Sequence, residues 1–248
     1  TDLRGSKYIN KSKYDYSLID VPNIFSNLLL IPFNFLKFCI SVIKSYKYLK
    51  LNKINILIST GGYMSLPFCI ASNLLNIKIY ILEPNCVIGR ANKLTLRFAK
   101  KIICYDKNLK GISRKYLNKI YLVKPLLRKE IYKFQKNEKK TFDEQKKILI
   151  IGGSQGAKFF DEFISSMIIK LSKMQNIKVL QQAINEKSKK NLKALYQKNH
   201  IHHEIFAFDD KLLTKIAGYD LAITRAGAST ISELSYLNIP FVAIPFPY

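Results

Sequence analysis

The sequence contains few residues of the types that usually bind metals. Its four cysteines have no CxxC spacing, and its three histidines lie together without cysteine or carboxylate partners at ligand spacing. We therefore predict no metal site and no bound cofactor, free thiols in a reducing compartment, and surface positions for the histidines. These residues are Cys39, Cys69, Cys86 and Cys104, with His200, His202 and His203.

Arginine is also scarce, although the formal net charge is +24. Nearly all of the positive charge comes from lysines that are scattered along the chain, and no stretch interleaves arginine with aromatic residues. This pattern argues against a nucleic-acid-binding protein, which remains only a remote alternative. A strongly basic protein still favours anionic partners such as acidic lipid surfaces and diphosphates.

The chain has no uninterrupted apolar run of the roughly 20 residues that a membrane-spanning helix needs. The most apolar stretch, residues 28–43, is broken by Pro32, Asn34 and Lys37, and lysines follow it up to Lys53. Two interpretations of residues 28–53 stay open. The stretch is either a helix that lies on a membrane surface or a core helix with a solvated basic face.

Strand and helix patterns alternate from Ile54 onward in two series. In the second series they predict, among others, strands over residues 177–182 and 241–244 and helices over residues 157–174 and 186–198. This alternation predicts an α/β fold with parallel sheets and right-handed crossovers. We assign residues 1–128 to a first Rossmann-like domain, 129–146 to a linker and 147–248 to a second Rossmann-like domain. The polar start at Thr1 and the end at Tyr248 predict that both domains are incomplete.

Small-residue turns follow several of the predicted strands. Gly152-Gly153-Ser154-Gln155-Gly156 is neither a GxGxxG fingerprint nor a Walker A loop, but it suits a diphosphate at a helix terminus. A second turn precedes the helix predicted from Thr230 to Leu237. Ser229 or Thr230 is expected to cap that helix, and Glu233 is placed to complete a capping box.

The same turns resemble the motifs of the MurG family of N-acetylglucosaminyltransferases. Residues 225–233 read Arg-Ala-Gly-Ala-Ser-Thr-Ile-Ser-Glu, and residues 152–157 read Gly-Gly-Ser-Gln-Gly-Ala. Residues 61–65, the Glu83 loop and residues 125–128 resemble three further family motifs. The resemblance implies a GT-B fold, with two Rossmann-like domains whose parallel sheets face each other across a cleft.

The resemblance also implies the reaction and its partners. An inverting enzyme of this family moves N-acetylglucosamine from UDP-GlcNAc to the lipid-linked acceptor lipid I, which gives lipid II for peptidoglycan synthesis. It works without a cofactor or metal, as a peripheral protein at the cytoplasmic face of the bacterial inner membrane, on an anionic lipid surface. The substrate-binding residues implied are Asn85, Arg128, Gly153, Ser154, Gln155, Phe208, Ala228, Ser229, Thr230, Ile231, Ser232 and Glu233.

The chain departs from the family pattern in several places. Leu82 and Pro84 replace the family's His and Gln, and the Gly-rich loop that carries the usual general base is absent. We therefore expect the 248 residues alone to be inactive, with Glu83 as a weak candidate for the catalytic base. Another GT-B UDP-sugar transferase or an epimerase is the alternative function.

Overall fold

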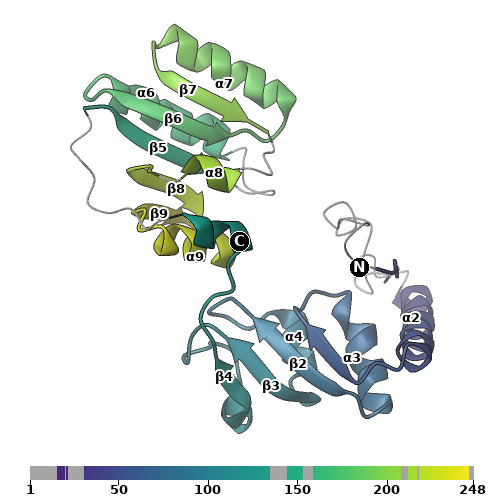
Figure 1. The fold of residues 1–248 in the computed structure, drawn as a ribbon. Helices are drawn as coiled ribbons and strands as arrows, with labels where there is room; N and C mark the ends of the chain where they lie inside the picture. Colours follow the sequence, from purple (N-terminus) through teal and green to yellow (C-terminus); the bar gives the residue numbers. More distant parts are fainter. Residues whose placement is uncertain are drawn as a thin grey trace. The chain divides into compact units, whose positions relative to one another are not determined.

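The chain forms two compact units, each built on one parallel sheet. We analysed a computed structural model, which describes residues 16–19, 21, 31–134, 144–152, 159–207, 212–216 and 218–245. The units are Thr1–Lys124 and Pro125–Tyr248 (Figure 1). The division lies before the predicted boundary at residue 128. The short helix η3 (Lys129–Lys133) packs into the second unit, where Ile131 is completely buried, so the start of the predicted linker belongs to this core.

The first unit has a four-stranded sheet in the order β1-β2-β3-β4, with every pair parallel. Ile81 and Ile102, on neighbouring strands, are completely buried, and Leu96 packs with them. The strands are β1 (Ile56–Ser59), β2 (Lys78–Glu83), β3 (Ala99–Cys104) and β4 (Ile120–Leu122), and the helices are α2 (Ile31–Leu51), α3 (Ser65–Leu74), α4 (Arg90–Thr95) and η2 (Arg114–Lys119).

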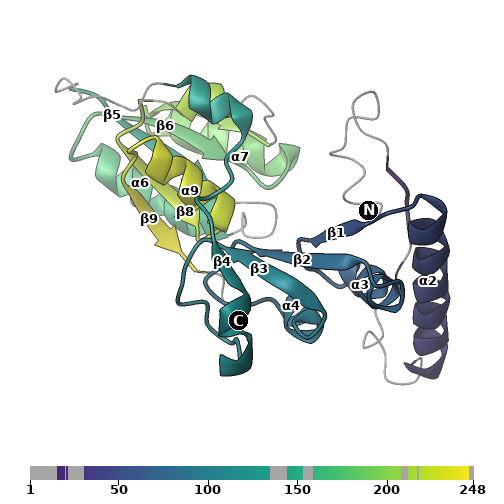
Figure 2. The ribbon, with the colours of Figure 1, turned by 60° about the horizontal axis from the view of Figure 1, so that its bottom comes forward.

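Helix α2 buries three polar side chains together with Phe38 and Leu49, and it leaves several other large apolar side chains exposed. It lies beside α3 (Figure 2). Its buried positions recur at helical spacing and are Asn34, Phe38, Ser41, Ser45 and Leu49. A second stripe, Phe33, Leu36, Ile40 and Ile43, is 44–59% exposed. No helix within the described residues is long and apolar enough to cross a membrane.

The second unit has a five-stranded parallel sheet in the order β7-β6-β5-β8-β9. The strand that comes first in the sequence of this unit, β5, therefore lies in the middle of the sheet. The chain adds β6 and β7 on one side of it and then β8 and β9 on the other side. The strands are β5 (Lys146–Ile151), β6 (Ile177–Gln182), β7 (His202–Phe206), β8 (Leu221–Arg225) and β9 (Phe241–Ile244), and the helices are η4 (Phe160–Ile164), α6 (Ser165–Ser172), α7 (Glu186–Lys198), α8 (Leu212–Ile216) and α9 (Ala228–Tyr236).

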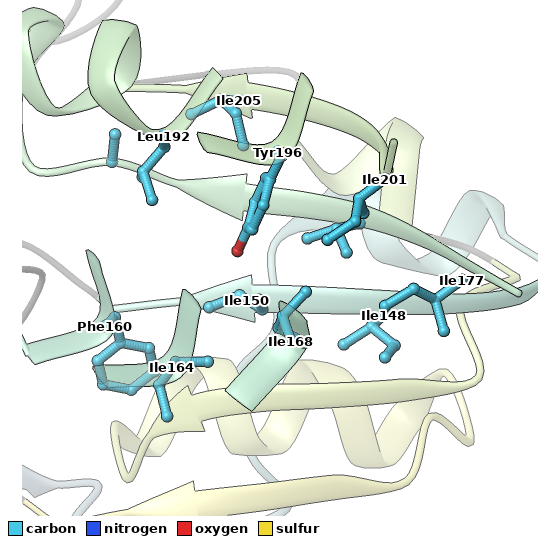
Figure 3. Packing of buried hydrophobic residues seen from close by; sticks show 12 residues of the cluster. Ile148, Ile150, Phe160, Ile164, Ile168, Ile177, Leu192, Tyr196, Ile201 and Ile205 are labelled. Atoms are coloured by element: carbon cyan, nitrogen blue, oxygen red, sulfur yellow. The ribbon is translucent and has the colours of Figure 1, made fainter. Parts of the chain in front are cut away.

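Strand β5 is buried on both faces, as a central strand of a parallel sheet should be. Ile148 and Ile150 point into a cluster with Phe160, Ile164 and Ile168 from η4 and α6 and with side chains of α7 (Figure 3). The alternate residue Leu149 packs on the opposite face, against Leu234 of α9. The second core layer therefore fixes α9 on the sheet, directly after β8.

The hydroxyl of Tyr196, which enters this core, is satisfied locally. The hydroxyl of Tyr196 donates a hydrogen bond to Oε1 of Gln181 at 2.5 Å, and the Gln181 amide donates to the carbonyl of Phe160. Burial raises the pKa of the Tyr196 hydroxyl far above its usual range, so this group stays protonated and serves as a donor. The network links β6 and α7 to the first residue of η4.

Candidate functional site

The strand order of the second unit locates one candidate site. Because the chain leaves β5 on one side for β6 and returns on the other side to β8, the sheet has a topological switch point between β5 and β8. Open parallel sheets bind ligands beyond the carboxyl ends of the strands at such a point. Strands β5 and β8 both end at this edge, at Ile151 and Arg225, because they run parallel.

The turn after β8 leads directly into α9. Gly227 is the N-cap with extended backbone angles, and its carbonyl accepts the first helical hydrogen bond, from Ile231 N at 3.0 Å. The prediction that Ser229 or Thr230 caps the helix is wrong, because α9 begins at Ala228 and takes both residues into its first turn. No side chain in the described part of the chain caps this N-terminus. Its N–H groups therefore suit an anionic ligand.

Glu233 is not part of a capping box either. Its carboxylate is 8% exposed and accepts two hydrogen bonds from Arg128, Nε to Oε1 and Nη2 to Oε2, both at 2.7 Å. This is a bidentate, charge-assisted pair, which fixes the orientation of the carboxylate. The hydrogen bonds that Arg128 donates to Glu233 also raise the pKa of the Arg128 guanidinium. The Glu233 carboxylate is thus held in a fixed orientation on α9, the helix that follows the switch point, with lone pairs left for further donors.

Arg128 reaches Glu233 because the chain around it is anchored on α9. Ile131, three residues after Arg128, is completely buried. The ring of Tyr132 meets the ring of Tyr236 edge-on, with centroids 5.3 Å apart. The Arg128 side chain itself remains 50% exposed. One face of the guanidinium is therefore accessible to a ligand at the switch point.

Arg225, at the end of β8, also lies at this edge, and the sequence did not indicate its contacts. Its Nη1 donates to the carbonyl of Pro245 at 2.6 Å, and its guanidinium lies 5.1–5.6 Å from the rings of Phe160 and Phe159. It therefore links the end of β8 to the chain after β9 and to the first residues after the Gly152 turn. The signal available was its position at a strand end, directly before the glycine.

The first unit offers a second edge, organised by Glu83 at the end of β2. Glu83 is 2% exposed. Its Oε1 accepts bonds from the backbone and side chain of Asn85 at 3.3 and 2.9 Å, and its Oε2 accepts from Gly89 N at 2.8 Å and Asn92 Nδ2 at 2.9 Å. A carboxylate that is buried and accepts four bonds shapes its loop. A catalytic base instead needs a lone pair directed at the substrate.

Asn92 connects this loop to the glycine turn after β1. A Cβ atom on Gly61 would lie 2.9 Å from Asn92 Nδ2, and the Gly61 φ of +84° is one that other residues rarely adopt. Only glycine fits at this close approach. The turns after β1 and β2, which the sequence placed at the same sheet edge, therefore do meet.

The structure brings together one group of the predicted binding residues. Arg128 and residues 228–233 lie at the switch point of the second unit, and Asn85 lies in the Glu83 loop of the first unit. Gly153, Ser154, Gln155 and Phe208 fall outside the described residues. Among the residues the structure does describe, no three His, Cys, Asp or Glu side chains are grouped to hold a metal ion. His202 is exposed and His203 packs against Tyr196.

Two family models match the chain, one in each half. The glycosyltransferase family 28 N-terminal domain matches residues 1–104, and the glycosyltransferase family 28 C-terminal domain matches residues 147–248. The chain is 43% identical, over its whole length and 68% of the relative, to the "UDP-N-acetylglucosamine--N-acetylmuramyl-(pentapeptide) pyrophosphoryl-undecaprenol N-acetylglucosamine transferase" of Pelagibacter ubique. The protein of the same name from Rickettsia canadensis is 34% identical over 99% of the chain and 69% of that relative.

A solved structure shows the same fold. The crystal structure of Acinetobacter baumannii MurG superimposes with a TM-score of 0.72 over 98% of this chain and 68% of that protein, at 24% identity. The predicted α/β fold of GT-B type, with two Rossmann-like domains, is confirmed by this likeness and by the two parallel sheets.

Proposed function

The chain belongs to the MurG family of N-acetylglucosamine transferases, and we propose that it carries out the family's reaction at the two sheet edges described above. It is a glycosyltransferase that moves N-acetylglucosamine from UDP-N-acetylglucosamine to the muramyl sugar of lipid I, which gives lipid II for peptidoglycan synthesis. The alternatives of an epimerase or of a different GT-B transferase are not favoured, because the relatives from Pelagibacter ubique and Rickettsia canadensis are both named as N-acetylglucosamine transferases.

One observation carries the assignment of the donor site. The carboxylate of Glu233 is buried, oriented by two hydrogen bonds from Arg128, and located on the helix that starts at the switch point. A fixed carboxylate can accept hydrogen bonds from two neighbouring ribose hydroxyls, which is how we propose that it binds the uridine. The uncapped first turn of α9, from Ala228 to Thr230, then lies beside the diphosphate.

The same arrangement supports the chemical step. The acceptor hydroxyl of the muramyl sugar attacks the anomeric carbon of N-acetylglucosamine and gives its proton to a general base, while the bond from that carbon to the diphosphate oxygen breaks with inversion. The negative charge that develops on the leaving UDP is stabilised by N–H groups at the start of α9 and by the exposed face of Arg128. Both groups are fixed before the reaction, so little reorganisation accompanies the step.

The edge formed by Gly61, Glu83 and Asn92 suits the acceptor. Glu83 acts there as a positioning residue, because its four hydrogen bonds fix the loop on which Asn85 is exposed. We propose that Asn85 binds substrate, and that the loop around it receives the head group of the lipid-linked acceptor.

Helix α2 supports peripheral attachment to the inner membrane at its cytoplasmic face. Its exposed apolar stripe, defined above as Phe33, Leu36, Ile40 and Ile43, is flanked by exposed Lys37, Lys44 and Lys47. Apolar side chains that insert into the lipid interface, with lysines beside anionic head groups, are typical of interfacial helices. Each lysine near such a surface contributes about 1 kcal/mol. Between the two interpretations that the sequence left open, this favours the membrane-surface helix.

The test of the function is transfer of radiolabelled N-acetylglucosamine from UDP-N-acetylglucosamine to lipid I in detergent micelles. From a protein that spans the full length of these relatives, of which this chain covers 68–69%, we expect a labelled product that extracts with lipid, and UDP released in equal amount. UDP release without labelled lipid, or a change of the free nucleotide sugar into its epimer, would contradict the proposal and favour the epimerase alternative.

A further inference from the structure

The first unit also contains a large groove to which the proposed function assigns no role. It has a volume of about 1100 Å³, in the range of pockets that hold drug-sized ligands. Apolar side chains of α2, α3, α4 and the residues just after α4 line it, chiefly Phe38, Leu66, Ile70, Leu94 and Phe98. Phe38 and Leu66 are buried, where they pack with Val21. Leu94 is 65% exposed, so the groove leaves apolar surface open to solvent.

One end of the groove lies at the acceptor edge. Gly62, from the turn after β1, and Gly89, from the Glu83 loop, both belong to its lining. Phe38 connects the groove to α2, the helix that carries the exposed apolar stripe. The groove therefore runs between the helix proposed to lie on the membrane and the loops proposed to receive the acceptor head group.

The rim of the groove is positively charged. Arg90, Lys93 and Arg97 of α4 and the residues just after it line the groove and are exposed. Within the described residues, none of the three forms a salt bridge, although the Arg97 guanidinium lies 4.5 Å from the ring of Phe98. An apolar groove edged with cations is complementary to a ligand that joins an anionic group to a hydrocarbon chain.

From these features we infer that the groove binds the first isoprene units of the acceptor's polyprenyl chain, with the cations of the rim beside its diphosphate. The inference rests on the proposed function, since it names the part of the lipid acceptor that lies next to the acceptor edge. In this arrangement the polyprenyl chain leaves the bilayer along α2 and passes between α3 and α4. Its diphosphate then lies near Gly62 and Gly89. Recognition thus includes the lipid and not only the sugar.

The test measures the affinity of the protein for inorganic diphosphate and for prenyl diphosphates with one, two and three isoprene units, by calorimetry in the absence of micelles. We expect inorganic diphosphate to bind most weakly and the affinity to rise by about tenfold or more from one to three units, as apolar surface is buried. Leu94→Glu should remove most of this rise. Arg97→Ala should lower the affinity for every ligand, including inorganic diphosphate, by a similar factor.

Leu74→Glu is the matched control, because Leu74 lies on α3, is 63% exposed and does not line the groove. This variant should keep the dependence on chain length. Affinities that do not change with chain length, or an equal loss in both glutamate variants, would overturn the inference. Failure of the proposed function gives a different result, namely length-dependent binding of prenyl diphosphates by a protein that transfers no sugar.

Discussion

Replacing Glu233 by alanine removes the carboxylate on which the proposed donor site depends. In the free protein the side chain makes two hydrogen bonds with Arg128 at 2.7 Å. Arg128 is 50% exposed and can be hydrated again when its partner is lost. The free energy of unfolding should therefore fall by only about 1 kcal/mol, since solvent screens a half-exposed ion pair.

The effect on the donor should be larger. A hydrogen bond to a charged group contributes about 1.5–3 kcal/mol, so loss of the ribose contacts should raise the Kd for UDP by about 10- to 150-fold. Isothermal titration calorimetry measures this directly. Glu186→Ala is the matched control, because Glu186 also pairs with a basic side chain, Lys189 at 3.3 Å, but lies on α7. A folded Glu233→Ala variant whose Kd for UDP stays within about twofold of the unaltered value would refute this reasoning.

Three further predictions concern other parts of the chain. Gly61→Ala should lower the free energy of unfolding by about 1–3 kcal/mol more than Gly62→Ala, measured by urea denaturation, because both have positive φ but only a Cβ atom at Gly61 would meet another residue, Asn92; equal losses would contradict the close approach. Replacing Ile40 and Ile43 together by aspartate should abolish sedimentation with anionic vesicles, and high salt should weaken that of the unaltered protein; unchanged sedimentation would show that α2 does not meet the lipid. Burial raises the pKa of the Asp161 carboxyl in the folded state above its unfolded value, so its ionised form destabilises the fold at neutral pH. The stability of Asp161→Asn relative to the unaltered protein, measured by thermal melts, should thus increase as the pH rises from about 3 to about 7. A stability difference between the two proteins that stays constant across this range would contradict the prediction.

Much of the fold could be predicted because its strands are buried and its turns are marked by glycine. The strands Ile177–Gln182 and Phe241–Ile244 and the helix Glu186–Lys198 have the predicted bounds. The helix predicted from residue 157 to 174 contains the π-helical turn η4 directly before α6, and α6 ends at Ser172. Such a turn depends on packing against the sheet, which periodicity in the sequence does not show.

The site was predicted in its motifs and not in its contacts. The run from Arg225 to Glu233 indicated a turn and a binding helix, and both are present. The partner of Glu233 is Arg128, 105 residues away in the sequence, and no local pattern relates two such positions. Local reasoning instead gave Glu233 a capping role within its own helix, which the tertiary ion pair replaces.

A crystal structure of the protein with UDP-N-acetylglucosamine tests the proposed donor site most directly. We predict that both ribose hydroxyls lie within hydrogen-bond distance, about 2.5–3.0 Å, of the Glu233 carboxylate oxygens. The diphosphate should lie at the first turn of α9, beside Arg128. The assignment would be contradicted by a nucleotide that binds at another edge of the sheet and contacts neither Arg128 nor Glu233, while the pair between these two residues stays unchanged.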